Sequence, residues 1–302
     1  MLLSIKILTW NISWGCMTAN QNSHHDLTAQ ALATHCYQLK QEHREPVCLQ
    51  NVSSLIDHQK KKHNLITLQE ASNWKILMKN SHRLSKMKYV HSKSDSSEII
   101  TFYDPDMFNL LEVSNGEIEA GRPCHLLLLE SRSNLKVIVI NVHNSKGYSY
   151  SPLELGLSKL ITPRIQQRLP QSNKNIHVII AGDFNDHGYS NYWKKTYPFK
   201  QLKNNLKKMT VSTKRKKPPL SCCVGKEDLN HCRLTDYSLY GDYILVSPSF
   251  KVSQNNHIHP GFNFDCLQHP TSDHLPISMT VVLNGSHHIK KSQKKIKKKL
   301  NL

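Results

Sequence analysis

The sequence predicts an α/β domain built from layers of strands and helices. Short apolar runs rich in β-branched residues recur along the chain between polar or turn residues, which is typical of buried strands. Stretches of helical character lie between some of these runs, and such alternation favours a layered α/β architecture. The chain has 302 residues, which is enough to bury a full core without disulfide bonds.

The runs and the stretches between them define the expected elements in chain order. We expect strands at residues 5–10, 65–68, 99–103, 125–129, 137–142, 177–181, 243–246 and 277–283. We expect helices at residues 26–39, 52–62, 73–80 and 153–168. The even spacing of these elements gives no reason to divide them, so we interpret residues 1–284 as one domain.

Positive charge is concentrated in two segments outside the expected elements. The net charge is +18, and residues 203–217 and 290–299 each contribute seven basic side chains. We interpret the first as a basic insertion loop at about residues 200–220 and the second as part of a disordered tail, residues 285–302. The two basic segments have three interpretations: they bind a polyanionic partner, they include a nuclear localisation signal at residues 214–218, or they only increase solubility. Neither segment contains interleaved aromatic residues, so stacking on single strands is not favoured.

Apolar runs and cysteines predict the compartment. No run approaches the roughly 20 residues that a membrane-spanning helix needs, so we expect no integral membrane association. The opening residues lead into a strand and are too short for a signal peptide, which argues against Sec-dependent secretion. The eight cysteines lack the spacing of a disulfide framework, which predicts a reduced, intracellular chain in the cytoplasm or nucleus.

Polar side chains with oxygen or nitrogen donors stand at the ends of six of the expected strands. They are Asn11, Glu70, His143, Asp183 with Asn185, Asp242, and Asp273 with His274. Carboxylate and amide oxygens suit Mg²⁺ or Mn²⁺, and histidines suit a phosphate oxygen or a leaving group. The chemistry that this set predicts is metal-assisted attack of water on a phosphoester.

Five motifs resemble those of the endonuclease/exonuclease/phosphatase superfamily, in its order, over about residues 5–283. They are Leu8-Thr9-Trp10-Asn11-Ile12, Leu68-Gln69-Glu70, Asn141-Val142-His143-Asn144, Gly182-Asp183-Phe184-Asn185 and Ser272-Asp273-His274-Leu275-Pro276. The resemblance implies a four-layer α/β sandwich, in which two packed mixed sheets are flanked by helices. It also implies a metal-dependent phosphoesterase, and we expect a monomer.

The resemblance also implies a role for each motif residue. Glu70 is the principal metal ligand, with Asn11 beside it and Asp273 as a second carboxylate. Asp183 orients or deprotonates the attacking water, and Asn185 holds the phosphate. The remaining assignments concern the histidines and the turn before one strand: His143 and His274 contact the phosphate, Asp242 orients His274, Glu98 orients a histidine, and Arg122 is either structural or phosphate-binding.

Departures from subfamily motifs bear on the substrate. Ile12 after Asn11 argues against abasic-site endonucleases, and Ser72 lacks the arginine that pancreatic-type deoxyribonucleases place there. Asp186 after Asn185 disfavours inositol polyphosphate 5-phosphatases, while the segment from Gly241 to Ile244 resembles deadenylase-type RNA exonucleases and tyrosyl-DNA phosphodiesterases. The opening motif resembles superfamily members of large DNA viruses. We therefore expect a nuclease or phosphodiesterase acting on DNA or RNA, with an inositol-phosphate or lipid-headgroup phosphatase as the alternative.

Overall fold

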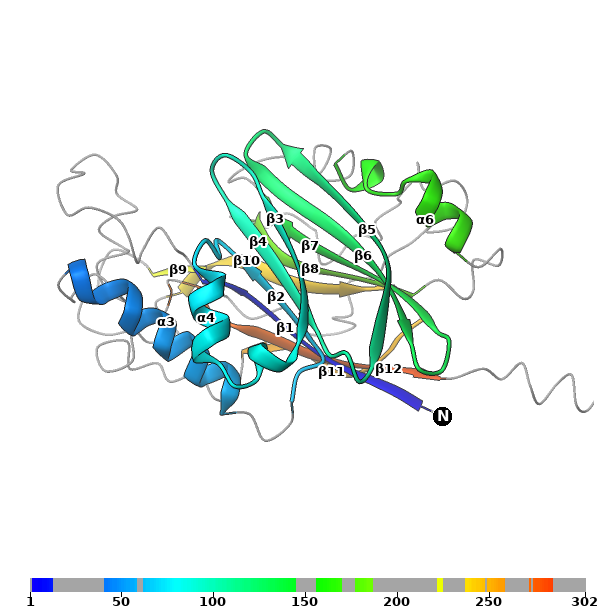
Figure 1. Cartoon of the computed structure of the whole chain (residues 1–302), viewed down its shortest axis with the longest axis horizontal. Coiled ribbons are helices and arrows are strands. Elements are labelled where there is room, and N and C mark those ends of the chain that lie inside the picture. Colours follow the sequence, from blue (N-terminus) through cyan, green and yellow to red (C-terminus); the bar gives the residue numbers. More distant parts are fainter. Residues whose placement is uncertain are drawn as a thin grey trace, which may run out of the picture.

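The structure is a computed structural model whose described residues include twelve strands. It describes residues 2–12, 41–58, 62–144, 156–169, 177–186, 222–224, 237–247, 249–258, 272 and 274–284. In chain order the elements are β1 (Leu2–Asn11), α3 (Gln41–Asp57), β2 (Leu65–Gln69), α4 (Trp74–Asn80), η1 (Leu84–Lys86), β3 (Lys88–Lys93), β4 (Glu98–Tyr103), β5 (Phe108–Glu119), β6 (Arg122–Ser131), β7 (Lys136–His143), α6 (Pro163–Arg168), β8 (His177–Asp186), β9 (Cys222–Val224), β10 (Tyr237–Val246), β11 (Lys251–Ile258) and β12 (Ile277–Asn284) (Figure 1).

The described strands form two six-stranded mixed sheets. The first has the order β11-β12-β1-β2-β4-β3 and the second has the order β5-β6-β7-β8-β10-β9. Each sheet contains a central parallel pair, β1 with β2 and β7 with β8, while the remaining pairs are antiparallel. The parallel pairs matter for function because parallel strands end at the same edge of a sheet.

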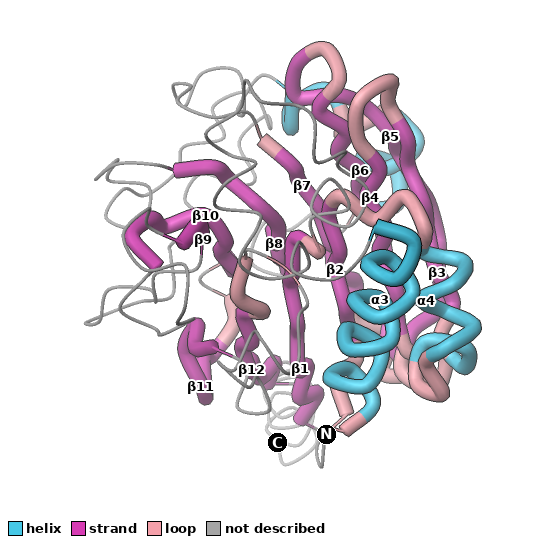
Figure 2. The backbone as a smooth tube through the Cα atoms, turned by 90° about the vertical axis from the view of Figure 1, so that its left-hand side faces the viewer, coloured by secondary structure: helices cyan, strands magenta, loops and turns pink. Residues whose placement is uncertain are grey.

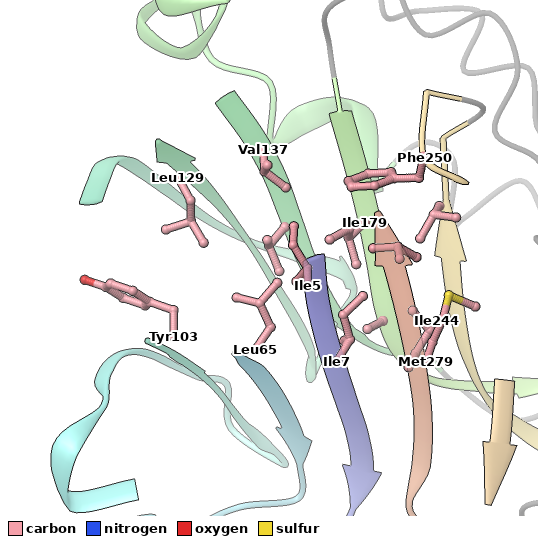
Figure 3. Close-up of a cluster of buried hydrophobic side chains, with 14 of the residues drawn as sticks. Ile5, Ile7, Leu65, Tyr103, Leu129, Val137, Ile179, Ile244, Phe250 and Met279 are labelled. Carbon is pink, nitrogen blue, oxygen red and sulfur yellow. The ribbon is translucent and has the colours of Figure 1, made fainter. Parts of the chain in front are cut away.

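The two sheets pack face to face through an apolar core. Alternate residues of a strand point to opposite faces, so Ile5 and Ile7 of β1 enter the space between the sheets. There they join Val137, Ile179 and Met279 from other strands (Figure 3). Every labelled aliphatic side chain of this cluster is almost fully buried.

Helices cover the outer faces of both sheets and complete four layers. Leu8 and Trp10 of β1 belong to a buried cluster that includes residues of α3 and α4. These two helices lie side by side (Figure 2). On the other side, Ile165 of α6 joins an apolar cluster on the outer face of the second sheet. The helix begins where the Thr162 side chain accepts from the Ile165 backbone N–H, with Pro163 in its first turn. The four-layer α/β sandwich that the sequence resemblance implied is therefore confirmed.

All eight strands expected from the sequence are present, but four further strands in the described part were missed. The missed strands are β3, β5, β9 and β11, and β5 carries polar residues throughout its length. The helix expected at 52–62 is α3, which begins at Gln41 and ends at Asp57. The stretch 153–168 is described from residue 156 onward. It forms one helical turn at residues 156–159, breaks at residues 160–162 and continues as α6. The stretch 73–80 matches α4.

Several expectations fall on residues outside the described part. They are the helix at 26–39, the insertion at about 200–220 and the tail at 285–302. Cys48 is disulfide-bonded, which differs from the reduced chain that cysteine spacing predicted. Within the described ranges, no helix combines the length and the apolar character needed to cross a membrane.

Candidate active site

The candidate site lies at one edge of the sandwich, where both parallel pairs end. In the first sheet, Asn11 ends β1 and is paired with Gln69, so Glu70 follows directly after the neighbouring strand. In the second sheet, His143 at the end of β7 is paired with Asp183 of β8, and Asp183 is also paired with Asp242 of β10. A bulge in β10 next to Asp242 interrupts the ladder at this point.

Unusual backbone conformations occur at the same edge. Glu70 has φ 52° and Asn185 has φ 47°, the left-handed region that non-glycine residues rarely adopt. Gly182 has φ 150°, and a Cβ atom at this position would collide with the carbonyl oxygen of Val142. The close approach of β7 to β8 therefore requires glycine directly before Asp183, and strain of this kind is common at functional sites.

Asn11 connects the two sheets through a single side-chain nitrogen. Its Nδ2 donates to Glu70 Oε1 at 3.1 Å and to Asp183 Oδ2 at 2.9 Å. The Glu70 side chain keeps 30% of its surface exposed, whereas Asp183 is 1% exposed. One carboxylate is thus open to solvent and the other is enclosed, and the same amide fixes both.

Asp183 is held by further donors from its own strand. The Asn185 backbone N–H donates to Oδ1 at 2.7 Å, and Asn185 Nδ2 donates to Oδ2 at 3.1 Å and to the carbonyl of Asn144 at 2.7 Å. Burial raises the pKa of Asp183, Asp242 raises it further, and the neighbouring histidines and Asn11 act in the opposite direction. These bonds fix the carboxylate in one orientation at the centre of the site.

His143 is buried and held in one tautomer. Its Nε2 lies 3.0 Å from Arg122 Nη1, which can only donate, so Nε2 accepts and Nδ1 carries the proton. Nδ1 therefore donates to Ser97 Oγ at 2.8 Å. Burial lowers the pKa of His143 to about 4, with Arg122 and His274 lowering it and Asp183 opposing the shift. The ring is neutral at pH 7, and Nε2 lies 3.6 Å from Glu70 Oε1 and 3.8 Å from Asp183 Oδ2.

His274 approaches Asp183 from the other side. Its Nδ1 lies 2.9 Å from Asp242 Oδ2, and its Nε2 lies 3.9 Å from Asp183 Oδ2. The backbone is fixed by Trp10 Nε1, which donates to the His274 carbonyl at 2.9 Å, and by Ser272 Oγ, which accepts from the His274 N–H at 3.1 Å. Ser272 Oγ in turn donates to the carbonyl of Asn11 at 2.7 Å, which joins this loop to β1.

Two groups of side chains have the donor chemistry for a divalent cation. Asp183, Asp242 and His274 place one ligand atom each within 4.8 Å of one another, and all three are buried. Glu70 offers a partly exposed carboxylate fixed by Asn11, and hard oxygen donors of this kind suit Mg²⁺ or Mn²⁺. In the buried group, His274 Nδ1 and Asp242 Oδ2 already contact each other at 2.9 Å. Glu70 is therefore more available than this group as a ligand for a metal ion.

The structure brings together most of the residues that the sequence singled out. Asn11, Glu70, Arg122, His143, Asp183, Asn185, Asp242 and His274 form one connected set through the contacts above. Asp273 lies outside the described residues. Glu98 contacts His91 Nε2 at 2.8 Å and Lys93 Nζ at 3.1 Å, so the histidine beside it is His91. His143 is bonded instead by Ser97.

Sequence reasoning missed two kinds of residue at the site. Ser97 precedes Glu98 in a turn between β3 and β4, and a serine in a polar turn carries no signal of its own. The second kind is a row of buried polar side chains between the sheets directly beneath the site. Its nearest members are Gln69, whose Nε2 donates to Asn141 Oδ1 at 2.8 Å, and Asn141, whose Nδ2 donates to Thr101 Oγ1 at 3.2 Å. The sequence signal that could have indicated this row was the presence of polar residues within two otherwise apolar strand runs.

Comparison with known proteins supports this picture at the level of the fold. No family model matches the sequence. Uncharacterized protein L684 of Acanthamoeba polyphaga mimivirus is 34% identical over 147 residues, which is 46% of this chain. The chain spans only 28% of the length of that relative.

Solved structures match over almost the whole chain. An endonuclease/exonuclease/phosphatase family protein from Bacteroides thetaiotaomicron has a TM-score of 0.61 at 14% identity, covering 95% of this chain and 98% of that one. ANGEL2, a 2',3'-cyclic phosphatase solved with adenosine-2',3'-vanadate, has a TM-score of 0.58 at 14% identity, covering 93% and 96%. The human Nocturnin catalytic domain, solved with a sulfate anion, has a TM-score of 0.57 at 17% identity, with the same coverage. The chain therefore has the endonuclease/exonuclease/phosphatase fold.

Proposed function

We propose that this protein is a divalent-metal-dependent phosphodiesterase that hydrolyses nucleic acid by attack of water on phosphorus. The observation that carries the proposal is the position of Asp183. Its Oδ2 accepts from Asn11 and lies 3.8 Å and 3.9 Å from the Nε2 atoms of His143 and His274. A fixed carboxylate between two imidazoles, next to a second and more open carboxylate, has the parts needed to position water and a phosphate together.

The first part is the metal site. We assign Glu70 as its principal protein ligand, with Asn11 beside it and Asp273 as a further carboxylate. A bound Mg²⁺ or Mn²⁺ would polarise a phosphoryl oxygen and neutralise charge as it develops. Asn11 holds Glu70 in place through Oε1, and 30% of the Glu70 side chain remains exposed.

The second part is water activation and charge stabilisation. Asp183 orients the attacking water and takes its proton, since three donors hold its oxygens and burial favours the protonated product. Asn185 holds Asp183 through Nδ2, and it would hold the phosphate once Nδ2 releases the Asn144 carbonyl. His274 has a carboxylate at Nδ1, so its Nε2 can donate to a phosphate oxygen or a leaving group. Arg122 contacts the phosphate from the His143 side.

Charge and the solved relatives support nucleic acid as the substrate. The net charge of +18 fits a polyanion, and the basic segments at 203–217 and 290–299 would add phosphate contacts. ANGEL2, which shares the fold, was solved with a vanadate of adenosine and is described as a 2',3'-cyclic phosphatase. An inositol-phosphate or lipid-headgroup phosphatase uses the same site chemistry, so the test includes such a substrate.

The proposal is tested by cleavage assays on labelled single- and double-stranded DNA and RNA beside an inositol polyphosphate. We expect cleavage of a nucleic acid with Mg²⁺ or Mn²⁺ and none in EDTA. Asp183→Asn should lower kcat by about 10² to 10⁴ or more, since general-base assistance is worth that much. Its control is Asp106→Asn, which removes one charge from an exposed carboxylate paired with Arg132. Cleavage of the inositol substrate alone, or full activity in EDTA, would contradict the proposal.

A further inference from the structure

A third basic segment lies beside the candidate site and folds into described elements. Residues 71–94 contain no Asp or Glu and six Lys or Arg, together with Trp74 and Tyr89. The segment includes α4, η1 and β3, and β3 is the edge strand of the first sheet next to β4. Unlike the basic segments at 203–217 and 290–299, this one brings aromatic rings into a basic surface.

Tyr89 is an exposed aromatic ring supported from one side. Its centroid lies 4.6 Å from that of Trp74, which is 7% exposed, while Tyr89 itself is 42% exposed. His91, on the same face of β3, has its ring 5.3 Å from Trp74, and Lys75 Nζ lies 5.7 Å from the Trp74 centroid. The buried indole thus holds the phenol ring in place and leaves part of it open to solvent.

The surface around Tyr89 carries uncompensated positive charge. Lys75, Lys79, Lys86, Lys88 and Lys93 are all exposed. Lys93 pairs with Glu98, whereas Lys75, Lys79, Lys86 and Lys88 form no ion pair within the described part of the chain. Charge complementarity therefore favours an anionic occupant.

This surface is continuous with the catalytic edge. The backbone N–H of Ala71, directly after Glu70, donates to the carbonyl of Glu98 at 3.0 Å, and Glu98 contacts both His91 and Lys93. Lys93 ends β3 at the catalytic edge, and Tyr89 lies four residues further back along the strand. At about 3.3 Å per residue this is about 13 Å.

We propose that Tyr89 and the lysines around it bind a single-stranded segment of the nucleic-acid substrate, with one base stacked on the Tyr89 ring. The inference rests on the proposed function and names the form of nucleic acid that the site receives. Stacking on a side chain needs an unpaired base, whereas lysines alone would accept any phosphate backbone. We call Trp74, Lys75, Tyr89, His91 and Lys93 the stacking strip.

The test measures binding in EDTA, so that cleavage does not interfere. Two labelled probes of equal length are compared: an oligothymidylate and an oligomer of abasic residues with the same number of phosphates. Tyr89→Ala should weaken oligothymidylate binding by about 5- to 150-fold, the range for removal of one base–aromatic stack. It should leave abasic binding nearly unchanged, and Tyr89→Phe should bind both probes like the wild type. Tyr89→Leu covers Trp74 without an aromatic face and repeats the test if Tyr89→Ala does not fold.

The lysines are tested by a matched pair, one beside Trp74 in the stacking strip and one at the far edge of the first sheet. Lys75→Ser should flatten the salt dependence of log K by about 0.7, because the variant binds one phosphate fewer. Lys251→Ser, on β11 at the far edge, removes an equally exposed charge and should not change the slope. Equal weakening with both probes on Tyr89→Ala, or none with either, would overturn the stacking strip. If the stacking strip fails this test but the wild type cleaves nucleic acid, the proposed function stands without the strip. If binding depends on the bases but no nucleic acid is cleaved, only the proposed function is overturned.

Discussion

The two histidines of the site differ in what holds them. His143 ends a strand of the second sheet, donates from Nδ1 to the Ser97 hydroxyl and accepts at Nε2 from Arg122. His274 lies before β12 of the first sheet, and its Nδ1 faces the buried Asp242 carboxylate at 2.9 Å. Both Nε2 atoms lie at nearly the same distance from Asp183 Oδ2, so the two rings share one centre with different partners.

The difference teaches how two identical side chains acquire different chemistry. A carboxylate at Nδ1 stabilises an imidazolium, whereas a hydroxyl at Nδ1 with an arginine at Nε2 favours the neutral ring. Burial and Arg122 accordingly lower the pKa of His143 to about 4. We therefore expect His274 to become an imidazolium during turnover. We expect His143 to stay neutral and to position Arg122.

The largest effect in this comparison is expected from Asp242→Asn. The change removes the charge that supports a protonated His274, so kcat should fall by about 10² to 10⁴, the range for general acid–base catalysis. The measurement is single-turnover cleavage by a variant whose thermal melt shows a folded protein. In a double-mutant cycle, adding His274→Gln to Asp242→Asn should cost little more, because both residues act as a unit. Additive losses would show that Asp242 and His274 act separately.

A smaller effect is expected from Ser97→Ala. The variant removes a neutral hydrogen bond from His143 Nδ1, and such bonds are worth about 0.5–1.5 kcal/mol, or about 2- to 12-fold. We expect this decrease in kcat/KM through weaker phosphate binding, since the free ring would hold Arg122 less firmly. Ser97→Thr keeps the hydroxyl and should restore most of the activity. A decrease as large as that of Asp242→Asn would break the proposed division between the two histidines.

The sequence predicted the strands and the catalytic edge because both leave local signals. The run at 177–181 is apolar and is followed by Gly182 and Asp183, so the buried strand and its polar end are both visible in five to seven residues. Strands such as β5 were missed because only part of their surface is buried, which leaves a polar, irregular pattern. The stacking strip was missed because Trp74 and Tyr89 meet only after α4 packs on β3.

The row of buried polar groups between the sheets was beyond sequence reasoning for a related reason. Each member satisfies the next across strands that are distant in the chain. Donors and acceptors run in one direction through the buried Gln69, Asn141, Thr101, His125 and Ser92, and the row ends at the exposed Asn115. Because the Ser92 hydroxyl donates to Asn115 Oδ1, Ser92 Oγ accepts from His125 Nδ1, and His125 Nε2 then accepts from the Thr101 hydroxyl.

His125 extends the comparison of the histidines to one that lies outside the site. Hydroxyls flank it at 2.7 Å and 2.9 Å, and burial, with a contribution from His91, lowers its pKa to about 3. The unfolded chain has a histidine pKa of about 6.5 and binds a proton that the folded protein does not bind between pH 6.5 and 3. Stability contributed by the neutral ring is therefore complete above about pH 6.5 and is lost as pH falls, by up to about 1.4 kcal/mol per pH unit.

His125→Gln isolates this contribution with the smallest expected effect at neutral pH. Glutamine can accept from Thr101 and donate to Ser92 without titrating, so the free energy of unfolding at pH 7 should fall by only about 1 kcal/mol. As pH is lowered through the window below about 6.5, the deficit relative to the wild type should shrink and then reverse, because only the wild type gains a proton on unfolding at this position. Urea unfolding over a pH series measures the difference. His177→Gln, at a histidine whose pKa burial lowers to about 4, should show the same sign over a narrower window. A deficit that stays constant with pH would mean that burial does not keep the His125 ring neutral, and the same explanation for His143 would then lose its support.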